Sequence, residues 1–251
     1  MGADRRAPLL FLLTLALFSA AASARYLQRG SSSGKVSLAL YYETLCPYCS
    51  NFIVNYLHKL FEDDQLMDIV DLKLVPYGNA KISQNGTVVC QHGKWECVLN
   101  KVEACSIDAL PSPKKQFDFI YCVEDFVYKY QYSEWAQCFN KVGVDPKPIM
   151  DCYNSQRGEE LILKYAAETG ALQPPHKYVP WVTVNGKPLY DDYQNFLAYI
   201  CKAYKGSNPP GTCAGISLKN PARTGGNSEL DTSPREADTS SINTKLATSA
   251  I

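Results

Sequence analysis

The sequence has no excess of charge of either sign. Its 25 lysine and arginine residues are balanced by 25 aspartate and glutamate residues, so the formal net charge is zero at pH 7. A surface that attracts nucleic acid or an anionic membrane carries a clear positive excess. The composition therefore supports neither class of partner.

Long apolar runs are also missing. The apolar segment 9–18 is about half the ~20 residues that a transmembrane helix needs. It follows Arg5 and Arg6 and precedes the small-residue site Ala22-Ser23-Ala24, which is the order of a secretory signal peptide. We therefore expect residues 1–24 to be removed and the mature chain to enter the secretory pathway without stable membrane insertion.

Histidine is scarce, whereas cysteine is abundant: the chain has three histidines and ten cysteines. All ten cysteines follow the predicted signal peptide, and an even number in an oxidising compartment predicts disulfide bonds. His92 lies between Cys90 and Cys97, which leaves a zinc site as the alternative to a disulfide there. The oxidising compartment favours the disulfide, and we expect no metal or organic cofactor.

A Cys-x-x-Cys motif lies between a predicted strand and a predicted helix. Residues 36–42 have the length and composition of a β-strand, and apolar residues recur at helical spacing over 52–61. Cys46 and Cys49 stand between them, and Pro47 suits a first helical position because its missing N–H is not needed there. Strand, motif and helix in this order are typical of a thioredoxin-like unit.

The position of the motif favours redox chemistry. The free N–H groups and the positive end of the helix dipole stabilise a thiolate at a helix start. A Cys-x-x-Cys cysteine there has its pKa lowered from ~8.5 to about 3.5–7.5. Cys46 is thus the candidate nucleophile, and Cys49 is the thiol that resolves the mixed disulfide. In the alternative, both cysteines are structural or bind zinc.

The strand pattern stops and then returns about one hundred residues later. Segment 69–75 alternates apolar and polar side chains, and 178–184 is a third strand followed by the hairpin signal Asn185-Gly186. Between them, about 88–170 has a mostly helical pattern, and a last helix is expected over 193–204. The expected class is α/β, a thioredoxin-like fold with a disulfide-stapled helical insertion between the second and third strands. The insertion carries Cys90, Cys97, Cys105, Cys122, Cys138 and Cys152.

One folded domain is expected over residues 36–213, between a flexible segment at 25–35 and a disordered polar tail at 214–251. Asn85 begins the sequon Asn-Gly-Thr, so it is a candidate glycosylation site on a surface loop. Cys201 ends the last helix and Cys213 follows a short Gly/Pro loop, so we expect these two to pair. The pairing of the other structural cysteines stays open.

Val179 and Pro180 stand at the start of the third strand. In a thioredoxin-like fold this place holds a cis-proline that faces the redox pair, and proline alone makes a cis bond cheap enough to keep. The preceding backbone can then pair with an extended substrate. The alternative is an ordinary trans proline at the start of a strand.

Several long motifs together resemble one family. The spacing from Cys90 to Cys105 resembles the signature of the gamma-interferon-inducible lysosomal thiol reductase family, and so do the segments around Gly78 and Pro180. In full, the matching residues are Cys90-Gln91-His92-Gly93, Glu96-Cys97, Asn100 and Cys105, with Tyr77-Gly78-Asn79-Ala80 and the run from Leu172 to Pro188. The resemblance covers about residues 36–213.

The resemblance implies a thioredoxin fold, reduction of protein disulfides in acidic endolysosomal compartments, and catalysis by Cys46 and Cys49. A small thiol would then recycle the enzyme, and the protein would be secreted or lysosomal/vacuolar. Two alternatives stay open from the residues themselves. The same parts could run as a disulfide oxidase or isomerase, or the chain could be a secreted, disulfide-stabilised binding protein with a structural Cys-x-x-Cys pair.

Overall fold

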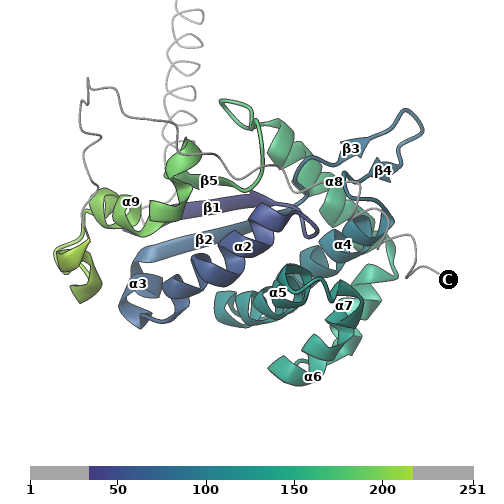
Figure 1. The fold of residues 1–251 in the computed structure, drawn as a ribbon, viewed down its shortest axis with the longest axis horizontal. Helices are drawn as coiled ribbons and strands as arrows, with labels where there is room; N and C mark the ends of the chain where they lie inside the picture. The colour runs from purple at the N-terminus through teal and green to yellow at the C-terminus, as the bar shows by residue number, and fades with distance from the viewer. Residues whose placement is uncertain (1–33, 217–251) are drawn as a thin grey trace, which may run out of the picture. The chain divides into compact units, whose positions relative to one another are not determined.

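A computed structural model of the chain describes residues 34–216 (Figure 1). The predicted signal peptide 1–24, most of the predicted flexible segment and most of the predicted tail lie outside the described residues. Within the described part, no helix combines the length and the apolar character needed to cross a membrane.

A four-stranded mixed sheet forms the centre of the domain (Figure 1). Strand β1 (Val36–Tyr42) pairs in parallel with β2 (Val70–Pro76) on one side and antiparallel with β5 (Trp181–Val184) on the other, and β6 (Lys187–Pro188) extends the sheet beyond β5. The Asn185-Gly186 turn joins β5 to β6, with both residues at positive φ, so the predicted hairpin is confirmed. Strand β1 is central, and its carboxyl end leads directly to the Cys-x-x-Cys motif.

The helix after β1 is shorter than its apolar spacing predicts. Helix α2 (Pro47–Asn55) ends where Tyr56 leaves helical geometry (φ −127°, ψ −55°), and the 3-10 helix η1 (Leu57–Phe61) continues the segment. Leu57 and Leu60 are both fully buried, and residues three apart lie on one side of a 3-10 helix. The spacing fits a 3-10 turn as well as an α-helix, which is why one continuous helix was the wrong prediction. A further helix, α3 (Asp64–Ile69), then leads into β2.

The helical insertion between β2 and β5 is confirmed, with one difference at its start. Residues near 88 form β4 (Val88–Val89), which pairs with β3 (Lys81–Ile82), so the helices begin at residue 94. They are α4 (Lys94–Ala109), α5 (Pro113–Tyr128), η2 (Tyr132–Gln137), α6 (Cys138–Val142), α7 (Pro146–Tyr153) and α8 (Gln156–Gly170). Pro113 and Pro146 each begin a helix, where a missing N–H has no cost.

Disulfide bonds staple this insertion and the end of the domain. Of the ten cysteines, all of which lie in the described range, eight are paired. The pairs are Cys90–Cys97, Cys105–Cys152, Cys122–Cys138 and Cys201–Cys213. The last of them confirms the predicted staple after helix α9 (Phe196–Ala203), which follows η3 (Tyr190–Asn195) and precedes η4 (Gly211–Gly215).

The buried side chains form two groups that meet in helix α5. Phe117 and Ile120 pack with the sheet, α2 and α9, whereas Phe119 and Val123 pack with α4, α7 and α8. Because α5 is apolar on two faces, it joins the insertion to the sheet. The start of α2 therefore stands on a scaffold that is packed on several sides.

Candidate redox-active site

Cys46 and Cys49 lie at the start of helix α2, as predicted. Cys46 is the residue that caps the helix, and the N–H of Cys49 donates to its Sγ at 3.4 Å. Both are free thiols, with 5% of Cys46 and none of Cys49 exposed. The more accessible sulfur is therefore the one at the helix N-terminus.

The two thiols differ in acidity. The pKa of Cys46 is lowered, first by the side-chain hydrogen bond from Cys49 and then by the N–H groups at the helix start. Burial raises the pKa of Cys49 well above its ordinary value, and the interaction with Cys46 raises it further. Cys46 is thus the first of the pair to ionise, and only a thiolate is a good nucleophile.

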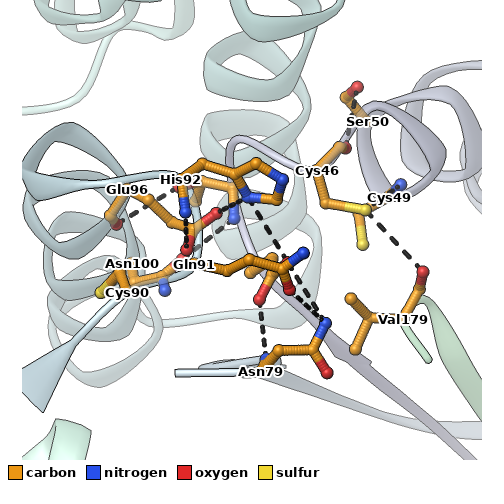
Figure 2. Close-up of polar contacts among 12 residues, drawn as sticks. Cys46, Cys49, Ser50, Asn79, Cys90, Gln91, His92, Glu96, Asn100 and Val179 are labelled. Carbon is orange, nitrogen blue, oxygen red and sulfur yellow. Dashed lines mark hydrogen bonds and ion pairs between the residues drawn. The ribbon is translucent and has the colours of Figure 1, made fainter. Parts of the chain in front are cut away.

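Val179 lies beside the redox pair, immediately before β5. Its backbone oxygen is 3.8 Å from Cys46 Sγ, so the protonated thiol points at this carbonyl (Figure 2). The Val179–Pro180 bond is cis, which confirms that prediction, and both residues are buried. The Gln173–Pro174 bond is also cis, which the sequence did not lead us to expect.

A buried carboxyl group lies in the loop that joins β1 to Cys46. Glu43 is fully buried, and its Oε2 accepts a hydrogen bond from the N–H of Asn79 at 2.7 Å. Gly78 has a φ of +60°, and a Cβ there would lie 2.3 Å from Glu43 Oε2. The turn after β2 therefore closes tightly over Glu43, and only glycine permits that approach.

The segment at the start of α4 contacts the same loop. His92 Nδ1 is 2.5 Å from Glu96 Oε2 and 3.5 Å from Glu43 Oε1, and Glu96 is fully buried. Asn100 Oδ1 accepts from the N–H of Thr44 at 3.0 Å. These contacts fasten the loop before Cys46 to helix α4 (Figure 2).

A zinc site at His92 would need sulfur ligands from Cys90 and Cys97, but these two cysteines are bonded to each other. Glu43, His92 and Glu96 each bring one possible ligand atom to within 4.8 Å of the others. His92 Nδ1 is already hydrogen-bonded to Glu96, so we assign no metal to this group.

The other two histidines are less directly involved. His176 Nε2 is 3.2 Å from Asn79 Oδ1, so this residue contacts the cluster around Glu43 through Asn79. His58 lies in η1 and pairs with Glu62, as expected for an ordinary helix residue. The sequence did not single out Glu43 or Asn79 as site residues, although Asn79 and Glu96 belong to motifs that carry the family resemblance.

Two further buried carboxyl groups lie deeper in the domain. The hydroxyl of Tyr42 donates to Glu103 Oε2 at 2.6 Å, whereas neither carboxyl oxygen of Glu124 has a hydrogen-bond partner. Burial raises the pKa of Glu103 to about 8 and that of Glu124 well above its ordinary value. Both groups are therefore uncharged in acid.

Comparison with known proteins gives consistent results. The family model for gamma interferon inducible lysosomal thiol reductase (GILT) matches residues 37–142. The gamma-interferon-responsive lysosomal thiol protein of Arabidopsis thaliana is 52% identical over 177 residues, which are 69% of this chain and 73% of that protein. The gamma-interferon-inducible lysosomal thiol reductase of Mus musculus is 39% identical over 190 residues, 74% of each chain.

Solved structures share the fold at low sequence identity. BdbD from Bacillus subtilis superposes with a TM-score of 0.50 at 16% identity, covering 70% of this chain and 91% of that chain. Mtb DsbA superposes with a TM-score of 0.51 at 19% identity, covering 74% and 90%. Together with the sheet order and the cis-proline, these likenesses confirm the predicted thioredoxin-like fold.

Proposed function

This chain belongs to the gamma-interferon-inducible lysosomal thiol reductase family and is a thiol-disulfide oxidoreductase, and from that premise we propose that Cys46 and Cys49 are its catalytic pair. One observation carries the assignment. Eight of the ten cysteines are paired as staples, and the two that remain face each other at a helix start, with the pKa of Cys46 lowered.

The reaction requires two thiol–disulfide exchanges. The Cys46 thiolate attacks one sulfur of a substrate disulfide, forming a mixed disulfide and releasing the other sulfur as a thiolate. Cys49 then loses its proton and attacks Cys46 Sγ, which forms the Cys46–Cys49 disulfide and releases the second substrate thiolate. Two electrons pass to the substrate, and each released thiolate takes up one proton. A small thiol reduces the pair again by the same exchange.

Val179 is the proposed substrate platform. Its carbonyl oxygen lies next to Cys46 Sγ, and we expect an extended substrate segment to hydrogen-bond to the backbone at this position, beside the sulfurs. Tyr48, in the first turn of α2 and two residues after Cys46, is 61% exposed and supplies an aromatic surface beside the motif. Protein disulfides in extended or unfolded segments are the substrate class that this arrangement supports.

The proposed setting is an acidic compartment of the secretory and lysosomal route. Its support is the sequence-predicted signal peptide and the word lysosomal in the names of the relatives. Asn85 lies exposed between β3 and β4, where a sugar chain has room, so we also propose it as the glycosylation site.

The test is insulin reduction by the purified mature protein, measured from pH 4 to pH 8 and followed by mass spectrometry of the enzyme. We expect reduction of insulin in acid and an oxidised Cys46–Cys49 pair after turnover. Oxidation of reduced substrates with no reduction of insulin would instead assign the chain to the disulfide oxidases. No reaction in either direction would favour a binding protein with a structural motif.

A further inference from the structure

Three side chains form a compact cluster beside the redox pair, which we call the acid–imidazole cluster: Glu43, His92 and Glu96. They come from two segments far apart in the sequence, the loop before α2 and the start of α4. His92 Nδ1 lies 2.5 Å from Glu96 Oε2 and 3.5 Å from Glu43 Oε1, and the side chains of both glutamates are almost fully withdrawn from solvent. Figure 2 shows His92 and Glu96 side by side. The proposed reaction uses none of the three.

The cluster is mechanically joined to Cys46. The N–H of Cys46 donates to the backbone oxygen of Glu43 at 3.4 Å. The next residue, Thr44, is fixed to Asn100 through its N–H and to the Glu96 carbonyl through its hydroxyl. A change in the charge of Glu43 or His92 therefore acts on a sulfur held at a fixed place.

We propose that Glu43 and His92 are positioning residues that adjust the charge next to Cys46 to the pH of the compartment. In acid, Glu43 is a neutral carboxyl and His92 an imidazolium, and this pair stabilises the Cys46 thiolate. As the pH rises, Glu43 becomes a carboxylate and His92 in turn loses its charge, and the thiolate is disfavoured. The proposal rests on the proposed role of Cys46 as nucleophile.

The acidities of the two groups agree with this scheme. Burial, with the charge of Glu96, raises the pKa of Glu43 to about 7. The hydrogen bond to Glu96 raises the pKa of His92, although burial opposes it. The carboxylate of Glu43 raises the pKa of Cys46, so its protonation in acid removes an unfavourable charge. Both groups thus become more positive as the pH falls.

Other titratable groups around the cluster do not offset this change. Glu103 and Glu124 stay neutral in acid because burial raises the pKa of each. Burial lowers the pKa of His176, and any charge that its ring gains as the pH falls is positive, as for His92. Burial raises the pKa of Tyr193, which interacts with both cysteines. Cys49 is held as a thiol, since burial raises its pKa. Glu96 remains as the hydrogen-bond partner of His92.

The test measures the alkylation of Cys46 by iodoacetamide between pH 4.5 and pH 8.5. The protein is reduced mildly, and mass spectrometry verifies that the label is on Cys46 and that the four structural disulfides are intact. Glu43→Gln keeps an oxygen acceptor for the N–H of Asn79 but cannot ionise, and His92→Gln removes the imidazolium. Glu160→Gln, on the exposed face of α8, is the control for the loss of one carboxylate.

We expect the two variants to deviate from the unaltered protein at opposite ends of the pH range. Glu43→Gln should react faster at pH 8 and equally at pH 5, whereas His92→Gln should react more slowly at pH 5 and approach the unaltered rate as the pH rises. Where Cys46 is still mostly protonated, each deviation should be on the order of threefold to tenfold, the change in thiolate fraction for a shift of half to one unit in the pKa of Cys46. Glu160→Gln should follow the unaltered protein throughout.

Either of two results for Glu43→Gln would overturn the proposal. Its alkylation rate could coincide with that of the unaltered protein at every pH. Alternatively, its rate could differ by one constant factor at every pH, which indicates only a disturbed loop. If His92→Gln fails to fold, the alkylation curve of Glu43→Gln alone decides the proposal. Insulin reduction on the same samples separates the two hypotheses. Failure of the unaltered protein to reduce insulin would count against the proposed function, whereas the alkylation curves report on Glu43 and His92 without turnover.

Discussion

At the scale of single residues, the site depends on an asymmetry between two chemically identical side chains. Cys46 has the N–H groups of Cys49 and Tyr48 near its sulfur and a slight exposure to solvent, whereas Cys49 is fully buried. A buried thiol with a raised pKa is a poor first nucleophile but attacks well once a neighbouring sulfur becomes electrophilic. The proposed order of the two exchanges follows from this difference.

This order gives a direct prediction. Cys46→Ser should abolish insulin reduction, because no thiolate remains at the helix start. Cys49→Ser should still attack substrates but should retain them as mixed disulfides, visible as higher-mass adducts on non-reducing gels and by peptide mapping. Adducts that form through Cys49 in the Cys46→Ser protein would reverse the assigned roles.

Gly78 gives a second prediction at this scale. Gly78→Ala introduces a methyl group 2.3 Å from Glu43 Oε2 at a φ of +60°. The matched control is Gly143→Ala, with a φ of +64° and no atom within 4 Å of the added carbon. Both variants incur the left-handed backbone cost of roughly 1–2 kcal/mol, but Gly78→Ala should lose more.

Thermal unfolding of these two variants measures the difference, and the pH profile of Cys46 alkylation should shift only in Gly78→Ala. Equal losses of stability and unchanged profiles in both would mean that the turn after β2 does not constrain Glu43.

At the scale of elements, helices α4 and α5 enclose carboxyl groups that are costly to ionise. The pKa of Glu103 is raised to about 8 in the folded protein, from about 4.5 in an unfolded chain. A carboxyl with a raised folded pKa contributes stability that is complete below about pH 4.5 and is lost as the pH rises through about 8. The carboxyl group of Glu103 therefore makes the domain more stable in acid than at neutral pH.

The corresponding prediction concerns Glu103→Gln, whose amide oxygen can still accept from Tyr42. The variant should gain stability relative to the unaltered protein at pH 8, on the order of a few kcal/mol, and little at pH 5. Urea unfolding at both pH values measures this. The control is Glu159→Gln, whose carboxyl lies on the exposed face of α8 and pairs with Lys101. A pH-independent difference for Glu103→Gln would contradict the prediction.

The elements also show what the sequence could and could not predict. Local rules predict the strands β1, β2 and β5, the Asn185-Gly186 turn and the helix start at Pro47, and the structure has all of them. The break at Tyr56 was missed because three-residue spacing of leucines fits a 3-10 helix and an α-helix alike. The short β3–β4 hairpin carries too few residues for a periodic pattern.

Some residues of the candidate site could also be predicted from the sequence, and others could not. The Cys-x-x-Cys pair and Val179–Pro180 were predictable, because their local context marks them. Glu43 was not, since one acidic residue in a loop has no local signature. Its role depends on Asn79 and His92, which are 36 and 49 positions away in the sequence and meet it only in the folded chain.

At the scale of the whole molecule, the four disulfides close loops of very different length. Cys201 and Cys213 are 12 residues apart, whereas Cys105 and Cys152 are 47 apart. Chain entropy predicts a contribution of about 3 kcal/mol from the first and about 4 kcal/mol from the second. Neither bond involves the redox pair.

We therefore expect Cys201→Ser/Cys213→Ser to lower the thermal midpoint, and Cys105→Ser/Cys152→Ser to lower it further, while both variants still reduce insulin at 25 °C. Calorimetry and the insulin assay on the same samples test this. Loss of activity in a sample that is fully folded at 25 °C would show that a staple is part of the catalytic machinery.

The contact between Cys46 and Val179 joins residues 133 positions apart. During synthesis, the Cys-x-x-Cys segment leaves the ribosome long before the strand that faces it, while the cysteines of the insertion are still being made. The helix start and the carbonyl beside it come together only when the polypeptide has been translated past residue 180 and β5 has docked against β1. On the proposed role of Val179, reductase activity is thus acquired only after the cysteines of the insertion have had the opportunity to find their partners.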